Sequence, residues 1–212
     1  MSKANAPIHF MDFGDVEIVC GTVSHNFPVH IHRATCYGVI TQGSAVFYCE
    51  GKQAHLKEGD CFFVPSGAPH TLLSVGGAVY SYCTFCVKHK TAPFDGDVFL
   101  QRVYNYMQRE TGKRLNLAEM ARHIGYSKYH AAHLFKEKAG LAPYRYHAAL
   151  RVAAVKRALQ SDANLLDLVH RYGFSDQSHL CNTFKKHMGL SPLQYKKAYH
   201  AYASAGEKVA KI

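Results

Sequence analysis

The sequence predicts a two-domain fold, an all-β barrel of the jelly-roll type followed by an all-α domain built from a duplicated helical unit. Short runs rich in β-branched and aromatic residues fill residues 1–88, whereas apolar residues at helical spacing follow from residue 97. Charge divides the chain at the same place, because residues 1–96 carry six basic and seven acidic side chains while residues 97–212 carry 19 and 8. This asymmetry predicts a basic module that meets a polyanion, joined to a near-neutral module with another task.

Composition narrows the class of protein further. Apolar residues make up 48% of the 212 residues, which is enough for a packed core. The N-terminus, MSKANAPIHFMDFG, contains no apolar run that could serve as a signal peptide, and no stretch approaches the length of a membrane span. We therefore expect a cytoplasmic protein without a membrane partner.

The cysteines are concentrated in the first half, which contains Cys20, Cys36, Cys49, Cys61, Cys83 and Cys86, while only Cys181 lies in the second. An odd number of cysteines in a cytoplasmic chain argues against a disulfide framework, so we expect small core residues. The Cys-x-x-Cys pattern in VYSYCTFCV resembles a redox or zinc motif. Its surroundings favour a strand instead, in which residues three apart point to opposite faces.

Six runs predict the strands of the first half, in the order VEIVCGTV (16–23), CYGVITQG (36–43), SAVFYCEG (44–51), CFFVP (61–65), TLLSVGG (71–77) and AVYSYCTFCV (78–87). Glu50-Gly51-Lys52 is typical of a hairpin turn. Regular short strands of this kind are typical of a sandwich or barrel. The Pro- and Gly-containing stretch after them predicts a linker. The expected divisions are a barrel over 1–88, a linker over 89–96, a helical domain over 97–200 and a tail over 201–212.

The helical half contains an internal repeat with a period of 48 or 49 residues. The recurring pairs are Gly125-Tyr126-Ser127 with Gly173-Phe174-Ser175, Phe135 with Phe184, Gly140-Leu141-x-Pro143 with Gly189-Leu190-x-Pro192, and Tyr146 with Tyr195. One extra residue lies between the repeated Ser and Phe of the second copy. One helical subdomain has thus been used twice.

Each copy has the pattern of a helix-turn-helix. A polar residue can cap the first helix, a glycine permits the tight turn, and a serine can cap the second helix. These residues are Asn116, Gly125 and Ser127 in the first copy, and Asn164, Gly173 and Ser175 in the second. An earlier helix, VFLQRVYNYMQRE, is expected to begin near Asp97. A long helix over 146–160 would hold the two copies at a fixed distance.

The two copies, GYSKYHAAHLFKEKAGLAPYRY (125–146) and RYGFSDQSHLCNTFKKHMGLSPLQY (171–195), resemble the DNA-binding domain of AraC-type transcription regulators. The resemblance covers about residues 98–200. It implies that the second helix of each copy enters one of two successive major-groove segments, about 34 Å apart.

The resemblance also implies which side chains meet DNA. The positions that match base-contacting residues are Tyr129, Ala132 and His133 on the first recognition helix, and Gln177, Ser178, Cys181 and Asn182 on the second. Gln and Asn can bind adenine in a bidentate manner, whereas Ala132 can only touch a thymine methyl group, so we expect the second helix to dominate specificity. The candidates for phosphate contacts are Lys128, Lys136, Lys185 and Lys186.

The first half resembles the cupin barrels that AraC-type regulators often carry. The first cupin motif, Gly-x5-His-x-His-x3,4-Glu-x6-Gly, is matched in its second part by His30, His32, Cys36 and Gly43, with cysteine in place of glutamate. The second motif, Gly-x5-Pro-x-Gly-x2-His-x3-Asn, is matched by Gly59, Pro65, Gly67 and His70, with Ser74 in place of asparagine. The resemblance covers about residues 8–88.

In metal-bearing cupins the matching positions are ligands, which transfers to His30, His32, Cys36 and His70. Three imidazoles and a thiolate would suit Zn²⁺, Co²⁺, Ni²⁺ or copper, but not Mg²⁺ or Ca²⁺. Alternatively, Cys36 is a buried core residue and the histidines line a pocket for an organic inducer without metal.

Together these features predict a transcription regulator whose cupin domain senses a small molecule or a metal. The resemblance implies promoter DNA and RNA polymerase as partners. Such regulators usually carry dimerisation helices between barrel and DNA-binding domain, for which this chain leaves no room. A monomer and a barrel-mediated dimer both stay open.

The rival hypothesis is a cupin metalloenzyme, a dioxygenase or isomerase with an appended DNA-binding domain, but no catalytic residues can be assigned. A constitutive activator with a purely structural barrel is a third alternative.

Overall fold

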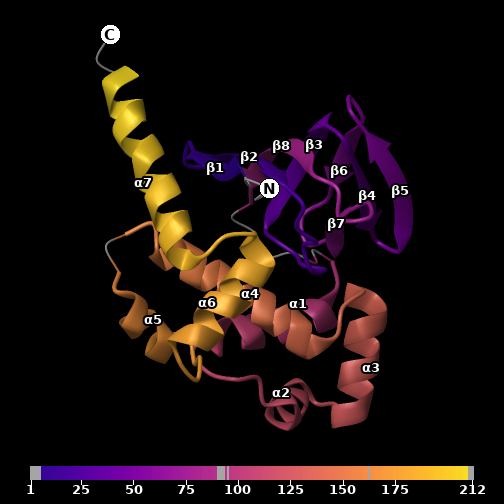
Figure 1. The fold of residues 1–212 in the computed structure, drawn as a ribbon. Helices are drawn as coiled ribbons and strands as arrows, with labels where there is room; N and C mark the ends of the chain where they lie inside the picture. The colour runs from indigo at the N-terminus through magenta and orange to yellow at the C-terminus, as the bar shows by residue number, and fades with distance from the viewer. Residues whose placement is uncertain (1–5, 90–93, 95, 162, 210–212) are drawn as a thin grey trace.

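The computed structural model describes residues 6–89, 94, 96–161 and 163–209 (Figure 1). The first half is all β and the second half is all α, which confirms the predicted fold class. Most of the expected linker, residues 90–93 and 95, lies outside the described residues. No helix in the described part of the chain has the length and apolar character needed to cross a membrane.

The barrel consists of two antiparallel sheets. One contains five strands in the order β1-β2-β8-β3-β6, and the other contains three in the order β5-β4-β7. Their bounds are β1 Ala6–Asp12, β2 Val16–Val23, β3 Ala34–Gln42, β4 Ser44–Cys49, β5 Lys52–Lys57, β6 Cys61–Val64, β7 His70–Ser74 and β8 Tyr80–Lys88.

Two strands were not among the predicted runs, β1 and β5. Strand β5, KQAHLK, buries only Leu56, because it lies at the edge of its sheet and exposes its other side chains. An edge strand of this kind lacks the apolar alternation that reveals a strand in a sequence. The turn before it was predicted correctly, since Glu50 and Gly51 form a two-residue loop with φ values of 50° and 77°.

Seven helices follow in the described part of the chain. Their bounds are α1 Val98–Arg109, α2 Leu117–Ile124, α3 Lys128–Ala139, α4 Pro143–Ala158, α5 Leu165–Arg171, α6 Gln177–Met188 and α7 Pro192–Val209. The recognition helices expected from the repeat are α3 and α6, and α4 is the long connection between the copies. Helix α7 continues beyond residue 200, where the expected domain ended.

Three of the four predicted caps are confirmed. The side chain of Asn116 accepts hydrogen bonds from the amides of Ala118 and Glu119, Ser127 accepts one from His130, and Asn164 accepts one from Leu166. The prediction of Ser175 was wrong, because the cap of α6 is Asp176, which accepts from the amide of His179 at 2.7 Å. The extra residue of the second copy lies in the turn before this helix and moves the cap by one position.

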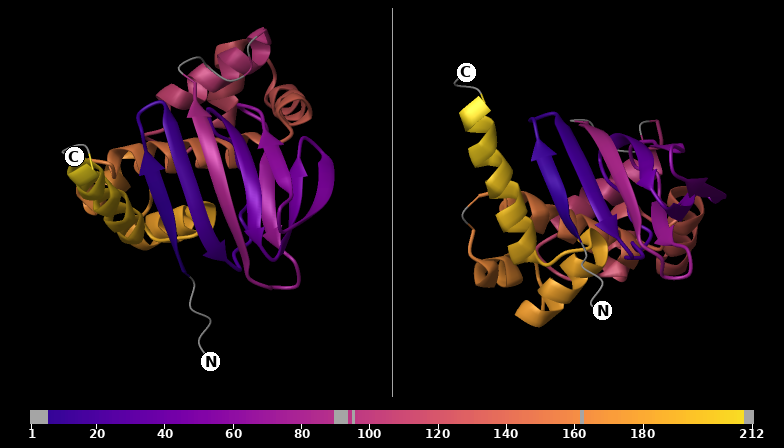
Figure 2. Two further views of the ribbon diagram at one scale, coloured as in Figure 1. Left: turned by 90° about the horizontal axis from the view of Figure 1, so that it is seen from above. Right: turned by 45° about the horizontal axis from the view of Figure 1, so that its top comes forward.

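The barrel packs directly on the helical half. A single hydrophobic cluster joins inward residues of the barrel, such as Phe10, to residues of α4–α7, such as Val155 and Tyr195. The rings of Phe10 and Tyr195 meet edge to face at 4.9 Å. Helix α7 lies beside the edge strand β1 (Figure 2). The two expected domains therefore share part of one core.

An ion pair crosses the same contact. Lys156 of α4 reaches Glu17 of β2 at 2.6 Å, and their side chains are 20% and 9% exposed. Lys156 Nζ also lies 5.4 Å from the centre of the Phe10 ring. Because both charges are largely removed from water, each depends on the other for its stabilisation.

We expect Lys156→Met to lower the free energy of unfolding by about 3 kcal/mol, because it leaves the Glu17 carboxylate buried without its partner. Chemical denaturation of the wild type and the variant measures this loss. The double variant Glu17→Gln/Lys156→Met should recover most of it, and Lys136→Met on the exposed side of α3 should have little effect. Equal losses in the single and double variants would contradict the ion-pair argument.

Candidate signal-binding and DNA-binding sites

A cavity of about 200 Å³ lies between the two sheets and extends to the helical half. Its barrel wall is mainly aromatic and aliphatic and includes Phe10, Phe27, Phe47, Phe62, Val64, Leu72 and Tyr82. Its helical wall comes from α4, with Ala149, Val152, Ala153 and Lys156, and from the last turn of α6, with His187 and Met188. An occupant of this cavity would therefore contact the barrel and the helical half at once.

Three histidines from the two cupin-like motifs meet at the barrel end of this cavity. His30 and His32 precede β3, and His70 begins β7. The backbones of His30 and His70 form a bridge, each amide donating to the other carbonyl at 3.0 Å. One possible ligand atom of each ring lies within 4.8 Å of the others. The structure thus brings together three of the four residues predicted as metal ligands.

Hydrogen bonds fix the same tautomer in all three rings. Nδ1 of His30, His32 and His70 lies 2.9, 3.0 and 2.9 Å from the carbonyl oxygens of Pro28, Ala34 and Ala68, respectively. Because a carbonyl oxygen only accepts, each Nδ1 carries the proton and donates it. The lone pair of each Nε2 is therefore free, which is the arrangement of metal-ligating histidines whose other nitrogen is held by the backbone.

Burial keeps these rings neutral. It lowers the pKa of His32 to about 3, with a further contribution from His30, and lowers the pKa of His30. The pKa of His70 is also well below its ordinary value, because of burial first and then the neighbouring His30 and His32. Neutral imidazole is the form that binds a metal ion.

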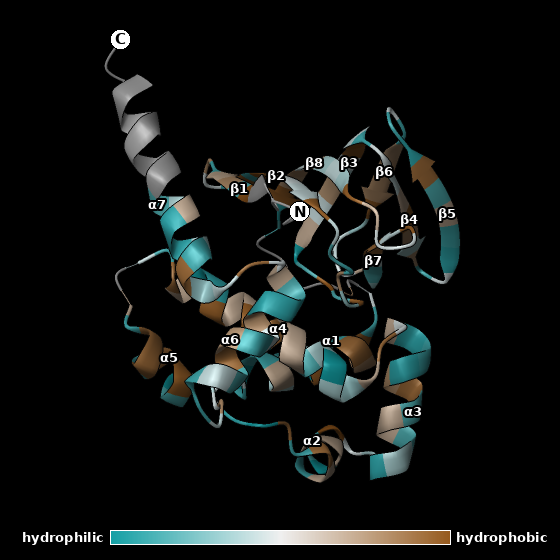
Figure 3. Ribbon diagram, viewed as in Figure 1, coloured by the Kyte–Doolittle hydropathy of each residue, from teal (hydrophilic) through white to brown (hydrophobic). Residues whose placement is uncertain are grey.

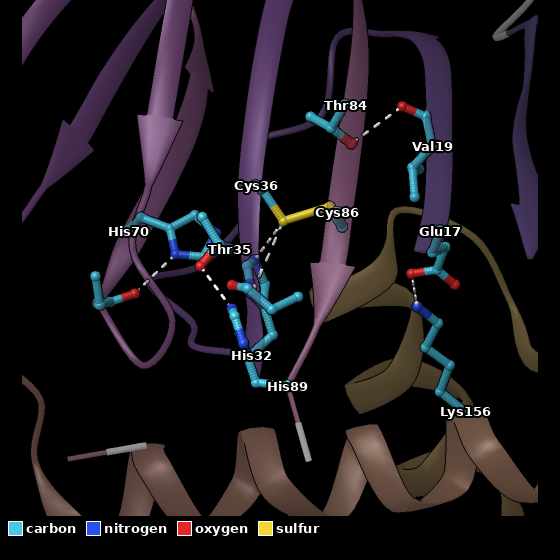
Figure 4. The surroundings of a disulfide bond; sticks show 12 residues. Glu17, Val19, His32, Thr35, Cys36, His70, Thr84, Cys86, His89 and Lys156 are labelled. Carbon is cyan, nitrogen blue, oxygen red and sulfur yellow. Dashed lines mark hydrogen bonds and ion pairs between the residues drawn. A yellow bond between two sulfur atoms is a disulfide. The ribbon is translucent and has the colours of Figure 1, made fainter. Parts of the chain in front are cut away.

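Cys36 lies beside the histidines, but its sulfur is bonded to Cys86. Cys36 Sγ is 3.7 Å from His32 Nε2, and Figure 4 shows the disulfide next to the His32 ring. A second disulfide joins Cys20 to Cys83. The expectation of no disulfides was therefore wrong. A sulfur held in a disulfide is not the thiolate that ligates a metal.

The register of the strands explains both disulfides. Cys20 stands directly opposite Cys83 on β2 and β8, and Cys36 stands opposite Cys86 on β3 and β8. The Cα atoms of the two pairs are 4.1 and 4.2 Å apart. Cys86 lines the cavity, whereas Cys83 lies three residues away on the other face of β8. The interpretation of CTFC as part of a strand is confirmed.

The predicted DNA-contacting residues lie on the outer sides of α3 and α6. Tyr129, His133, Gln177, Ser178 and Asn182 are exposed, whereas Ala132 and Cys181 are half-buried. The four lysines predicted to meet phosphates, Lys128, Lys136, Lys185 and Lys186, are also exposed. The opposite sides of the two helices enter the core through Phe135, Leu180 and Phe184, each fully buried. In Figure 3 the ribbons of α3 and α6 carry hydrophilic residues (teal) among hydrophobic ones.

The end of α6 touches both the cavity and the barrel. His187 and Met188 line the cavity, and Nε2 of His25 in the barrel lies 2.9 Å from the carbonyl oxygen of Lys186. Burial lowers the pKa of His187 to about 4. Sequence reasoning missed His187 and Lys156 as parts of the cavity, because both belong to the other predicted domain and carry no motif.

Two family models match the chain, each on one of its halves. Residues 18–92 match an AraC-like ligand binding domain, and residues 120–198 match a helix-turn-helix domain. The chain is 32% identical over 91 residues to PqrA of Proteus vulgaris, which is named a probable transcription factor, covering 42% of this chain and 73% of that protein. It is 24% identical over 119 residues to the transcriptional activator AarP of Providencia stuartii, covering 56% of this chain and 87% of that protein.

Among solved structures, the chain resembles a transcriptional regulator with an AraC-type DNA-binding domain from Chromobacterium violaceum. The sequence identity is 22% and the TM-score is 0.46, with 48% of this chain and 91% of that chain covered.

The lowered histidine pKa values predict acid sensitivity. Below pH 6.5 the unfolded chain takes up protons on His32 and His187. In the folded chain His32 is protonated only near pH 3 and His187 only near pH 4. Stability should therefore fall as pH falls from 6.5 towards 4, by up to about 1.4 kcal/mol per pH unit for each such histidine. Urea unfolding of the metal-free protein at pH 7 and pH 5 measures the slope. His187→Gln should reduce it, and equal stability at the two pH values would contradict the burial argument.

Proposed function

The chain belongs to the AraC-type transcription regulators, and from this premise we propose that α3 and α6 read duplex DNA under the control of a signal in the barrel cavity. The observation that carries the proposal is the shared wall of the cavity, which combines barrel residues with α4 and the last turn of α6. A signal bound there would contact the elements that position both recognition helices.

The DNA-reading part of the proposal rests on exposed side chains of suitable chemistry. Gln177 and Asn182 of α6 are exposed and can each bind an adenine edge in a bidentate manner. On α3, Tyr129 and His133 are exposed, but neither offers such a pair of hydrogen bonds. We propose that α6 supplies most of the base specificity, while the exposed lysines and the net charge of the helical half hold the phosphates.

The signal can change DNA binding only if it binds two arrangements of the protein with different affinity. The packing supports such a difference, because α4 joins the two helix-turn-helix copies and contributes Val152 and Lys156 to the cavity. An occupant that shifts α4 against the barrel changes the relative placement of α3 and α6. The same occupant meets Met188 at the end of α6 directly.

For the signal we propose a transition metal held by His30, His32 and His70. Three neutral imidazoles suit Zn²⁺, Co²⁺, Ni²⁺ or copper, and three protein ligands leave a coordination position open. Cys36 lies close enough to His32 to join this set once its disulfide to Cys86 is reduced. The metal would bring the two cupin-like motifs together through their side chains as well as their backbones.

An organic inducer is the second candidate, and the size and lining of the cavity favour it. A volume of about 200 Å³ exceeds what a single ion requires, and most of the wall is aromatic or aliphatic. In this case the histidines would donate or accept hydrogen bonds to polar groups of the inducer. An organic molecule bound to the open position of a metal would combine both candidates.

AarP is named as an activator, and we propose that this chain also activates transcription, with RNA polymerase as its partner.

The rival hypothesis is that the chain is a cupin metalloenzyme. In the described cavity Glu17 is paired with Lys156, which leaves this carboxylate poorly placed as a general base. Metal-dependent turnover of a small substrate would favour the rival.

We expect Gln177→Ala or Asn182→Ala to weaken binding to the cognate operator by about 1–3 kcal/mol and to relax base preference locally. Lys185→Ala should instead weaken all sequences similarly and reduce the salt dependence. Fluorescence anisotropy with the selected operator and a scrambled duplex, at several salt concentrations, measures both effects. Loss of discrimination in His133→Ala but not in Gln177→Ala would show that α3 is the main reader.

Metal uptake should depend on histidines that are distant in sequence. Elemental analysis of protein purified without a histidine tag or chelator should show one bound ion, and His70→Ala should remove most of it. His55→Ala is the control, because His55 is exposed on β5 and outside the cavity. Cys36→Ser should alter the affinity for the metal only under reducing conditions, because only then is the Cys36 thiol released from its disulfide. If the wild type takes up none of the four metals at micromolar concentration, the metal proposal fails and the organic inducer remains.

A further inference from the structure

The outer face of the five-stranded sheet carries an apolar row that crosses all five strands. The strand registers align Met11 of β1, Ile18 of β2, Phe85 of β8, Tyr37 of β3 and Phe63 of β6. These residues alternate along β2, β8, β3 and β6 with side chains that line the cavity, so they point to the opposite face. The rings of Tyr37 and Phe63 lie 5.1 Å apart.

This face is exposed although it is apolar. Tyr37, Phe63 and Phe85 are 56%, 48% and 45% exposed. The view from above in Figure 2 looks onto the sheet, and no described helix crosses it. The outward positions next to the row include Val16, Val39, Val87, Cys61 and Thr35, and none of these or of the row itself is charged. Aromatic enrichment with depletion of charge is typical of the centre of a protein interface.

We propose that this face is the contact between two copies of the chain. Strand β8 is the middle strand of the sheet, and Phe85 is therefore the middle residue of the row. A two-fold axis lying between two such faces and running along β8 places Phe85 on its counterpart. It also places the large rings of Tyr37 and Phe63 over the smaller Ile18 and Met11 of the partner copy. The row is thus complementary to itself, as a two-fold contact requires.

Area and charge fit a second copy. Strands about 4.8 Å apart, with outward residues about 6.7 Å apart, give a footprint on the order of 500 Å² for each copy. Two such faces bury on the order of 1,000 Å², which is near the lower limit of specific interfaces, so we expect a weak, concentration-dependent dimer. The face is uncharged, so it offers no complement to a charged partner. The helical half, which carries the net positive charge, packs against the inward side of the barrel, and α7 runs past the sheet beside its edge strand β1 (Figure 2).

Sedimentation velocity on the full-length chain, over about 1–100 µM, measures the monomer–dimer equilibrium. Phe85→Lys and Tyr37→Lys should each weaken the dimer at least about tenfold, because a charge would have to be buried against apolar side chains. Tyr144→Lys is the matched control, since Tyr144 is 55% exposed and lies on α4 in the helical half. Circular dichroism and thermal melting of each variant check that the fold is kept.

The proposal predicts a dimer in the wild type and in Tyr144→Lys, and mainly monomer in the two sheet variants with unchanged melting. A wild type that stays monomeric throughout the concentration range would overturn it. So would sheet variants that dimerise as tightly as the control, because the dimer would then use another surface. A sheet variant that loses its fold is replaced by Phe63→Lys at the edge strand β6, for which the same outcome is expected.

Discussion

The contact between α4 and the open side of the barrel is the interaction on which the rest of the structure depends. It combines apolar packing, through Val152 and Val155, with the buried ion pair between Lys156 and Glu17. Because α4 also joins the two helix-turn-helix copies, its position against the barrel determines where α3 and α6 lie. The same contact closes the cavity, so sensing and DNA binding depend on one helix.

The chemistry at the barrel end of the cavity follows from burial. Backbone carbonyls hold Nδ1 of three histidines, and burial lowers the pKa of each ring, so that neutral nitrogens gather in a mostly apolar space. Such a space favours a ligand that brings positive charge or polar groups to these nitrogens. The disulfide between Cys36 and Cys86 removes two thiols of the cavity wall that could otherwise add negative charge there.

Much of this arrangement could be predicted from the sequence, because local signals carry it. Turn glycines and caps such as Asn116 specify the repeat, and the spacing of His30, His32 and His70 specifies the site. Strand β5 was not predicted because an exposed edge strand has no apolar pattern. The cap at Asp176 was not predicted because an inserted residue shifts the start of α6. The disulfides depend on strand register, and the helical wall of the cavity depends on tertiary packing. Neither leaves a local signal in the sequence.

Hydrogen–deuterium exchange with and without operator DNA tests the central claim, that the cavity and the DNA-binding helices are coupled, most directly. Coupling is reciprocal, so DNA on α3 and α6 must alter the cavity even when no signal is bound. The account predicts changed exchange at the amides of His30 and His70, which bond to each other's carbonyls, and in the last turn of α6. Changes confined to α3 and to the exposed surface of α6, with unaltered exchange at His30 and His70, would contradict it.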